Sequence, residues 1–196
     1  VAKGKQTGRL IKATYPGAPS AAAATPSWYV PAATAKPFEA TNDELVKGLS
    51  HSSHEVRLTA QRRLADRKAA KELEAVLKNG TPAAKRHAIW ALDAIGSGAA
   101  LQALRDSDAS VRRQAARQLG TRRVKEAVEP LVALLRDGDA AVRFQAATAL
   151  GRIGNAAAGP ALQAALEEKD LFARHLWLVN EGAALSVGHG VAAEGE

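Results

Sequence analysis

The chain has 196 residues, a formal net charge of +7 and a composition that is 46% hydrophobic but only 4% aromatic. It contains no cysteine, which excludes disulfide bonds, thiolate metal ligands and cysteine nucleophiles. No apolar run approaches the roughly 18 residues that a membrane span needs, so we expect no such span. The chain begins at Val1 and has no methionine, and we therefore expect a fragment or a processed chain.

Residues 1–40 form a leader rich in proline and alanine, which we expect to be irregular. Within it, residues 8–15 alternate in the way that predicts one short strand. A lone strand cannot bury its own face, so this one is expected to end another unit or to lie as an arm on the rest of the protein. Trp28, Tyr29 and Phe38 should attach the leader to the body, because free aromatic side chains would leave apolar surface exposed.

From residue 41 onward the chain repeats itself every 27–31 residues. In each repeat a basic residue is followed by alanine three positions later and by leucine seven positions later, offsets that share one stripe of an α-helix. The clear copies are Arg57/Ala60/Leu64, Lys85/Ala88/Leu92, Arg112/Ala115/Leu119 and Arg143/Ala146/Leu150. A decayed fifth copy starts at Arg174, with Trp177 and Glu181 at the later positions. We expect a repeat domain over residues 41–182 and a flexible tail over 183–196.

Each repeat is predicted to be a pair of helices. Four residues before each basic anchor stands a residue of the helix N-cap type, at Ser53, Thr81, Asp108, Asp139 and Asp170. An earlier helix is expected at 43–50, 70–79, around Leu101 and Leu104, at 126–136 and at 159–168. Thr41 and Glu44 predict a capping box, and Gly96, Gly120 and Gly154 are expected to end second helices. The fold class is therefore all-α, an α-solenoid of about five short hairpins with an irregular N-terminal arm.

The pattern Asp-x-x-Val-Arg-x-x-Ala-x-x-x-Leu-Gly occurs at Asp108–Gly120 and Asp139–Gly151. It resembles the short HEAT-like repeat of bacterial proteins, the type also found in phycobilin lyases. This resemblance covers about residues 43–175 and implies a HEAT-like solenoid that binds other proteins. An accessory protein that handles a bilin, as a lyase does, is one alternative that it leaves open.

A narrower resemblance rests on Gly8–Lys12 with the proline-rich stretch after it, and on Leu58-Thr-Ala-Gln-Arg-Arg-Leu64. These segments are similar to large secreted proteins of the planctomycete type, which join a sugar-dehydrogenase-like β-propeller to HEAT-like repeats and often to a cytochrome c module. The resemblance implies that residues 8–15 are the last propeller strand and residues 16–40 a linker. It also implies a periplasmic or secreted location, with every catalytic and haem-binding residue outside this chain.

The basic anchors form a ladder, Arg57, Lys85, Arg112, Arg143 and Arg174. We expect them to pair with acidic residues of neighbouring repeats and so to stack the array. A nucleic-acid surface that contacts phosphates is the alternative function. It is disfavoured because residues 1–42 carry a net charge of +4, which leaves only +3 for the rest of the chain.

Two tryptophans stand close to a basic residue and a histidine, Trp90 after Arg86 and His87, and Trp177 after Arg174. They could pack between adjacent helices, or they could form a partner-binding site, since tryptophan and arginine dominate such sites. The candidate partner-binding residues are Arg86, His87, Trp90, Arg113, Arg117, Arg174 and Trp177. The expected partner is another protein or a neighbouring domain of the same polypeptide.

No residue pattern predicts catalysis in this chain. A Ser-His-Asp set, a carboxylate pair and a glycine-rich phosphate loop are all missing from the sequence. His51 and His54 stand three residues apart, but no third side chain completes a zinc site with them. We therefore expect no metal and no cofactor, and a scaffold that is not an enzyme, as part of a larger secreted dehydrogenase-like redox protein.

Overall fold

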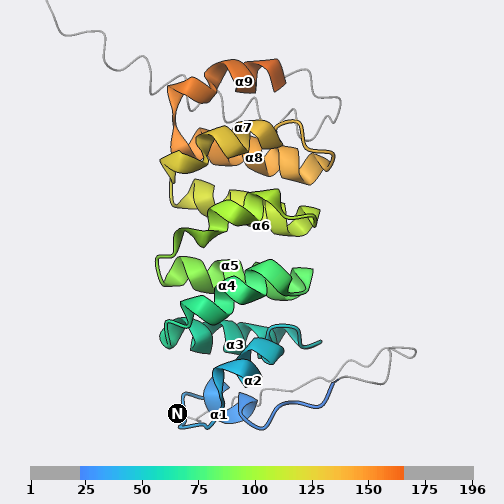
Figure 1. Ribbon diagram of the computed structural model, residues 1–196, viewed down its shortest axis with the longest axis vertical. Coiled ribbons are helices and arrows are strands. Elements are labelled where there is room, and N and C mark those ends of the chain that lie inside the picture. The colour runs from blue at the N-terminus through green and yellow to red at the C-terminus, as the bar shows by residue number, and fades with distance from the viewer. Residues whose placement is uncertain (1–22, 166–196) are drawn as a thin grey trace, which may run out of the picture.

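The computed structural model describes residues 23–165, and all regular secondary structure in that range is helical. The described helices are α1 (Tyr29–Ala33), α2 (Asn42–Gly48), α3 (His54–Asp66), α4 (Ala70–Asn79), α5 (Pro82–Ala94), η1 (Gly98–Arg105), α6 (Ala109–Thr121), η2 (Lys125–Ala127), α7 (Val128–Leu134), α8 (Ala140–Ile153), η3 (Ala156–Ala158) and α9 (Gly159–Ala164). The helices stack in pairs along the long axis of the molecule (Figure 1). The predicted all-α solenoid is confirmed, whereas the expected strand at 8–15, the repeat at Arg174 and the tail lie outside the described residues.

Each hairpin contributes one helix to each of two layers. The first-helix layer consists of α2, α4, η1 and α7, and the second-helix layer consists of α3, α5, α6 and α8. In the second-helix layer α3 packs on α5, α5 on α6 and α6 on α8, while α4 packs on α5 and α7 on α8. A single hairpin cannot bury its own apolar face, so neighbouring hairpins share one continuous core.

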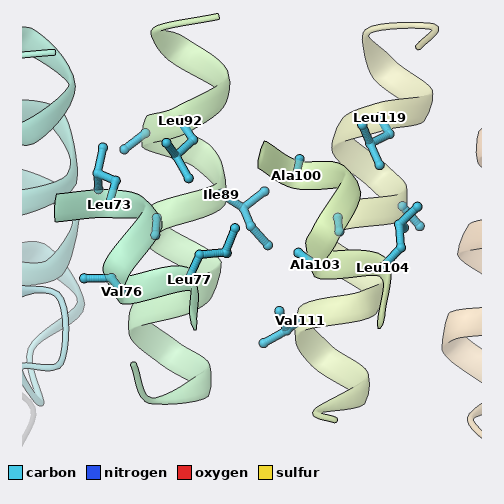
Figure 2. Close-up of a cluster of buried hydrophobic side chains, with 14 of the residues drawn as sticks. Leu73, Val76, Leu77, Ile89, Leu92, Ala100, Ala103, Leu104, Val111 and Leu119 are labelled. Atoms are coloured by element: carbon cyan, nitrogen blue, oxygen red, sulfur yellow. The ribbon is translucent and has the colours of Figure 1, made fainter. Parts of the chain in front are cut away.

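The repeated apolar residues of the second helices form this core. Val111, Ala115 and Leu119 of α6 are buried, and so are the valine or alanine, alanine and leucine at the same positions of α3, α5 and α8. In Figure 2 the side chain of Ile89 points from α5 toward η1, beside Leu77 of α4. Truncating one of these leucines to alanine is expected to destabilise the fold by about 2–5 kcal/mol.

Side-chain caps fix where most of the long helices begin. Thr41 and Glu44 form the predicted capping box of α2. The hydroxyl of Thr81 accepts from the backbone N–H of Ala84 at 3.3 Å, and the carboxylates of Asp108 and Asp139 cap α6 and α8. Ser53 also occupies an N-cap position, but its side chain makes no capping bond. The capping prediction is therefore wrong for Ser53, and Asp170 lies outside the described residues.

Two of the three glycines expected to end helices do so. Gly96 and Gly154 have φ angles of +77° and +68°, which glycine adopts without strain. Gly120 is a correction, because it lies inside α6. A Cβ at Gly120 would stand 2.6 Å from the backbone Cα of Ala149 in α8. Gly120 therefore serves the close approach of two second helices, which requires the smallest residue.

The leader was expected to be irregular up to residue 40, but it contains the short helix α1, which packs on α3. Trp28 is only 5% exposed, and a Cβ at Gly48 would lie 2.8 Å from its indole ring. The ring of Phe38 lies beneath the guanidinium groups of Arg63 and Arg67, at 5.8 and 5.4 Å. The leader aromatics thus cover the apolar end of the first hairpin, since an array needs a cap at each end.

Candidate interaction surface on the second-helix layer

The basic anchors bind the turns between the two helices of a hairpin. Arg112 donates from Nη1 to the carbonyl oxygens of Asp106 and Ser107, both at 2.9 Å. Arg57 does the same with His51 and Ser52, at 2.6 and 2.8 Å. Arg143 repeats the contact with the turn of its own hairpin. The recurring arginine is required because a guanidinium can satisfy two carbonyl groups of one tight turn.

The anchors also connect one repeat to the next. Arg112 makes two bonds of 2.7 Å to the carboxylate of Asp137, which belongs to the following hairpin. Lys85 reaches Asp106 in the same way, at 2.6 Å. The bond from Arg112 lowers the pKa of the Asp137 carboxyl below its ordinary value, although burial opposes this shift. The structure therefore places these anchors in repeat stacking, and Arg174 lies outside the described residues.

His87 takes the place of an acid between the first two repeats. Its Nε2 accepts from Nε of Arg57 at 3.3 Å, so its Nδ1 carries the proton and donates to Oε1 of Gln61 at 2.7 Å. Burial, followed by the nearby charges of Arg57 and His54, lowers the pKa of His87 to about 4. His87 is thus a neutral link between α3 and α5, and its ring nitrogens are already occupied.

Trp90 lies on the outer side of α5, where its side chain is 40% exposed. It stands five residues after the anchor Lys85. The same offset from Arg57 gives Arg62 on α3, and from Arg112 it gives Arg117 on α6, both exposed. One helical turn earlier, Arg86 and Arg113 hold matching positions on α5 and α6. We call the group Arg62, Arg86, Trp90, Arg113 and Arg117 the Trp90 surface.

The Trp90 surface brings together four of the seven sequence candidates. The ring of His87, one turn from Trp90, is bonded to Arg57 and Gln61 of α3, while Arg174 and Trp177 lie outside the described residues. Arg86 donates from Nη1 to the hydroxyl of Ser110 at 2.6 Å, which holds it against α6. Arg62 is the one member of the surface that is not among the sequence candidates. The signal that identifies it is its offset from the anchor, which equals that of Trp90.

The charge of the second-helix layer is one-sided. α6 and α8 contain no acidic residue between their first and last positions. In α3, Glu55 is exposed in the first turn and Asp66 is paired with Arg63, and in α5 Asp93 is paired with Arg122. The first-helix layer, in contrast, carries acidic side chains on α2, α4 and α7, namely Asp43, Glu44, Glu72, Glu74 and Glu129. The two layers therefore offer surfaces of different charge.

No ligand-binding centre stands out in the described part of the chain. A groove of about 370 Å³ runs along the ends of α5 and α6, but its polar groups Asp93, Gln118 and Arg122 are bonded to one another. Between residues 23 and 165, no three potential metal ligands are grouped together. His51 accepts from the backbone N–H of Ser53 at 3.0 Å, and the His54 ring faces His87. No helix in that range is long and apolar enough to cross a membrane.

The fold and the repeat pattern define a helical-repeat scaffold, and comparison with known proteins identifies the repeats. Residues 99–178 match the family described as HEAT repeats. Among solved structures, the complex of CpcE and CpcF of phycocyanin lyase from Nostoc sp. is 23% identical, with a TM-score of 0.56 over 76% of this chain and 67% of that chain. An engineered protein is also 23% identical, with a TM-score of 0.52 over 74% of this chain and 79% of that chain. No curated protein matches. Residues 99–178 are thus similar to HEAT repeats, and the described part of the chain has the fold of a helical-repeat array.

Proposed function

We propose that this chain is a non-catalytic scaffold that binds another protein, or a neighbouring domain of its own polypeptide, through the Trp90 surface. One observation carries the proposal. Trp90 is 40% exposed, whereas no other large apolar side chain in the described part of this layer is exposed. A few residues supply most of the binding energy at protein interfaces, and tryptophan and arginine are enriched among them.

Five aspartate side chains already have structural partners, which supports the proposal that the chain is non-catalytic. Asp93, Asp106 and Asp137 are held in ion pairs, and Asp108 and Asp139 cap helices. A carboxylate that acts as a general base must be able to reach a substrate. These carboxylates have structural partners instead, which accounts for their recurrence in the repeats.

We further propose that the scaffold is part of a larger secreted dehydrogenase-like redox protein. This proposal rests on the sequence resemblance of Gly8–Lys12 and Leu58–Leu64 alone. Reading the gene on both sides of the chain tests it. A β-propeller domain before Val1 or a Cys-x-x-Cys-His motif after Glu196 is expected, and stop codons on both sides would contradict the proposal.

A binding measurement tests the scaffold itself. The domains encoded on either side of the chain would be purified and titrated with the full chain by calorimetry. Trp90→Ala is expected to weaken binding about 30-fold, which corresponds to the roughly 2 kcal/mol of an interface hot spot. Val30→Ala is the matched control, because Val30 on α1 is 60% exposed but distant in the array. Equal binding of both variants would exclude the Trp90 surface as the contact.

A second candidate function is binding of nucleic acid through phosphates, which the lack of acidic residues in α6 and α8 favours. Each phosphate neutralised would add about −0.9 to the slope of log affinity against log salt. Three exposed arginines, Arg62, Arg113 and Arg117, would give a slope near −2.7. Retention of duplex binding at 200 mM salt would favour this function over the scaffold.

A further inference from the structure

We propose that the Trp90 surface binds an extended acidic segment of a partner protein. The segment runs across the helices along the axis of the array. It places an apolar side chain on Trp90 and acidic side chains about three residues before and after it. The inference rests on the proposed scaffold function and specifies the chemistry of the partner.

Neighbouring second helices lie side by side in the same register. Arg152 of α8 and Thr121 of α6 both stand nine residues after their anchors, and Arg152 Nη1 donates to Thr121 Oγ1 at 3.3 Å. Arg57, the anchor of α3, bonds His87, which stands two residues after the anchor of α5. Asp93 of α5 bonds both Gln118 and Arg122 of α6, and its offset of eight lies between their offsets of six and ten. Residues with equal offsets are therefore neighbours across the layer. Arg62, Trp90 and Arg117 form a row over α3, α5 and α6.

The spacing along this row sets how many residues of a ligand separate its contacts. Packed helices have axes about 8–10 Å apart, so equivalent residues of adjacent helices are separated by about that distance. An extended chain advances about 3.3 Å per residue. A ligand that crosses from one helix to the next therefore uses about three residues. The row Arg62, Trp90, Arg117 matches the pattern acidic-x-x-apolar-x-x-acidic.

The exposed arginines of the Trp90 surface can bind acidic groups of a ligand. The anchors Lys85 and Arg112 are used by Asp106 and Asp137. Arg62, Arg113 and Arg117 are exposed, and their side chains form no ion pair or hydrogen bond with another residue of the range 23–165. Arg113 and Arg117 are four residues apart, so they share one face of α6. Two acidic groups can thus be bound there.

An acidic peptide matches the chemistry of this row better than a nucleic acid does. The middle of the row is Trp90, and the flanking arginines of the row lie one helix away on either side. A duplex carries phosphates about every 3.4 Å along each strand, so most phosphates that cross this surface would face no cation. A peptide can place an apolar side chain on the indole and carboxylates on the arginines. The surface fits a peptide of mixed chemistry better.

The experiment uses the full chain and labelled synthetic peptides, with binding followed by fluorescence anisotropy. The test peptide carries Glu-x-x-Leu-x-x-Glu with serine and glycine at the x positions. We expect it to bind at least tenfold more tightly than a peptide with both glutamates changed to glutamine, and than one with leucine changed to serine. An equal affinity for all three peptides would overturn the proposal.

Charge reversal locates the contact. Arg117→Glu should weaken the acidic peptide about tenfold, and a peptide with its second glutamate changed to lysine should bind this variant better than it binds the natural chain. Lys78→Glu is the matched control, because Lys78 is exposed on α4 in the first-helix layer and its change alters the net charge equally. An equal loss in both variants would show a general charge effect and overturn the proposal.

Two further outcomes separate the proposals from one another. If a flanking domain binds through Trp90 but Arg62→Glu and Arg117→Glu leave its affinity unchanged, the scaffold function stands and the acidic-segment inference fails. If an oligonucleotide of equal charge binds more tightly than the peptide and depends on the same arginines, the surface is a phosphate site and the inference also fails. Far-UV circular dichroism of each variant confirms that the helices are retained.

Discussion

Two contacts in the second-helix layer start from the same anchor position of the repeat but use different acceptors. Between α6 and the turn before α8, Arg112 forms a two-bond ion pair with Asp137. The Arg112 side chain is 17% exposed and the Asp137 side chain is 7% exposed. Between α3 and α5, Arg57 instead donates to the neutral ring of His87. The anchor arginine therefore takes either a carboxylate or a neutral ring nitrogen as its partner in the next repeat.

The largest effect on stability is expected from Asp137→Ala, which removes the carboxylate that Arg112 binds. The Arg112 side chain, which is 17% exposed, would lose its ionic partner and keep only its bonds to the turn carbonyls, so we expect a cost of up to about 3 kcal/mol. The turn would also lose the bond that the backbone N–H of Asp139 donates to Asp137. Urea unfolding should show a lower midpoint.

The control for this prediction is Asp66→Ala. Asp66 is also paired with an arginine, but its side chain is 62% exposed, so its loss should cost less than about 1 kcal/mol. Similar midpoints for the two variants would show that burial does not distinguish the two pairs.

An intermediate effect on stability is expected from pH, through the neutral ring of His87. The pKa of His87 is lowered to about 4 from an ordinary value of 6.5, so the unfolded chain takes up the proton first as the pH falls. The stabilisation is complete above pH 6.5 and is lost progressively as the pH falls toward 4. The shift sets a limit of about 3 kcal/mol, and solvent screening of the partly exposed ring reduces this to about 1–2 kcal/mol.

The measurement for His87 is the free energy of unfolding between pH 7 and pH 4, compared with His87→Gln. Glutamine keeps a polar side chain that does not titrate, so the variant should lose less stability over this range. Parallel curves for the two proteins would exclude His87 as the cause.

The smallest effect is expected from Ser53→Asp, which makes the start of α3 resemble those of α6 and α8. Aspartate can accept from the first-turn N–H groups that Ser53 leaves unbonded, and it also favours the positive end of the helix. Thermal unfolding should show a gain of about 0.5–1 kcal/mol. Ser52→Asp, one residue before the cap, adds the same charge without a capping position, and an equal gain there would attribute the effect to charge alone.

The offsets of the sequence predicted the ladder well and the exposed surface only in part. The anchor at 0, alanine at +3 and leucine at +7 were enough to expect Arg112 against an acid of the next repeat, because a helix places these positions on one stripe. The same pattern left two interpretations of Trp90, packed between helices or exposed for a partner. His87 was grouped with Trp90 because the two are close in sequence, but the His87 ring bonds to Arg57 and Gln61 of α3 whereas Trp90 is exposed.

The sequence by itself determined the helical hairpins, most of their caps and the buried stripe, since these depend on residues within one repeat and on the 3.6-residue period of the helix. Only the tertiary structure decided which residues meet across repeats. It turned Gly120 from a helix end into a point of close approach to Ala149, made His87 a link to α3, and set Trp90 between Arg62 and Arg117. The reason is that contacts between repeats depend on helix spacing and register, and residues of one repeat do not encode either quantity alone.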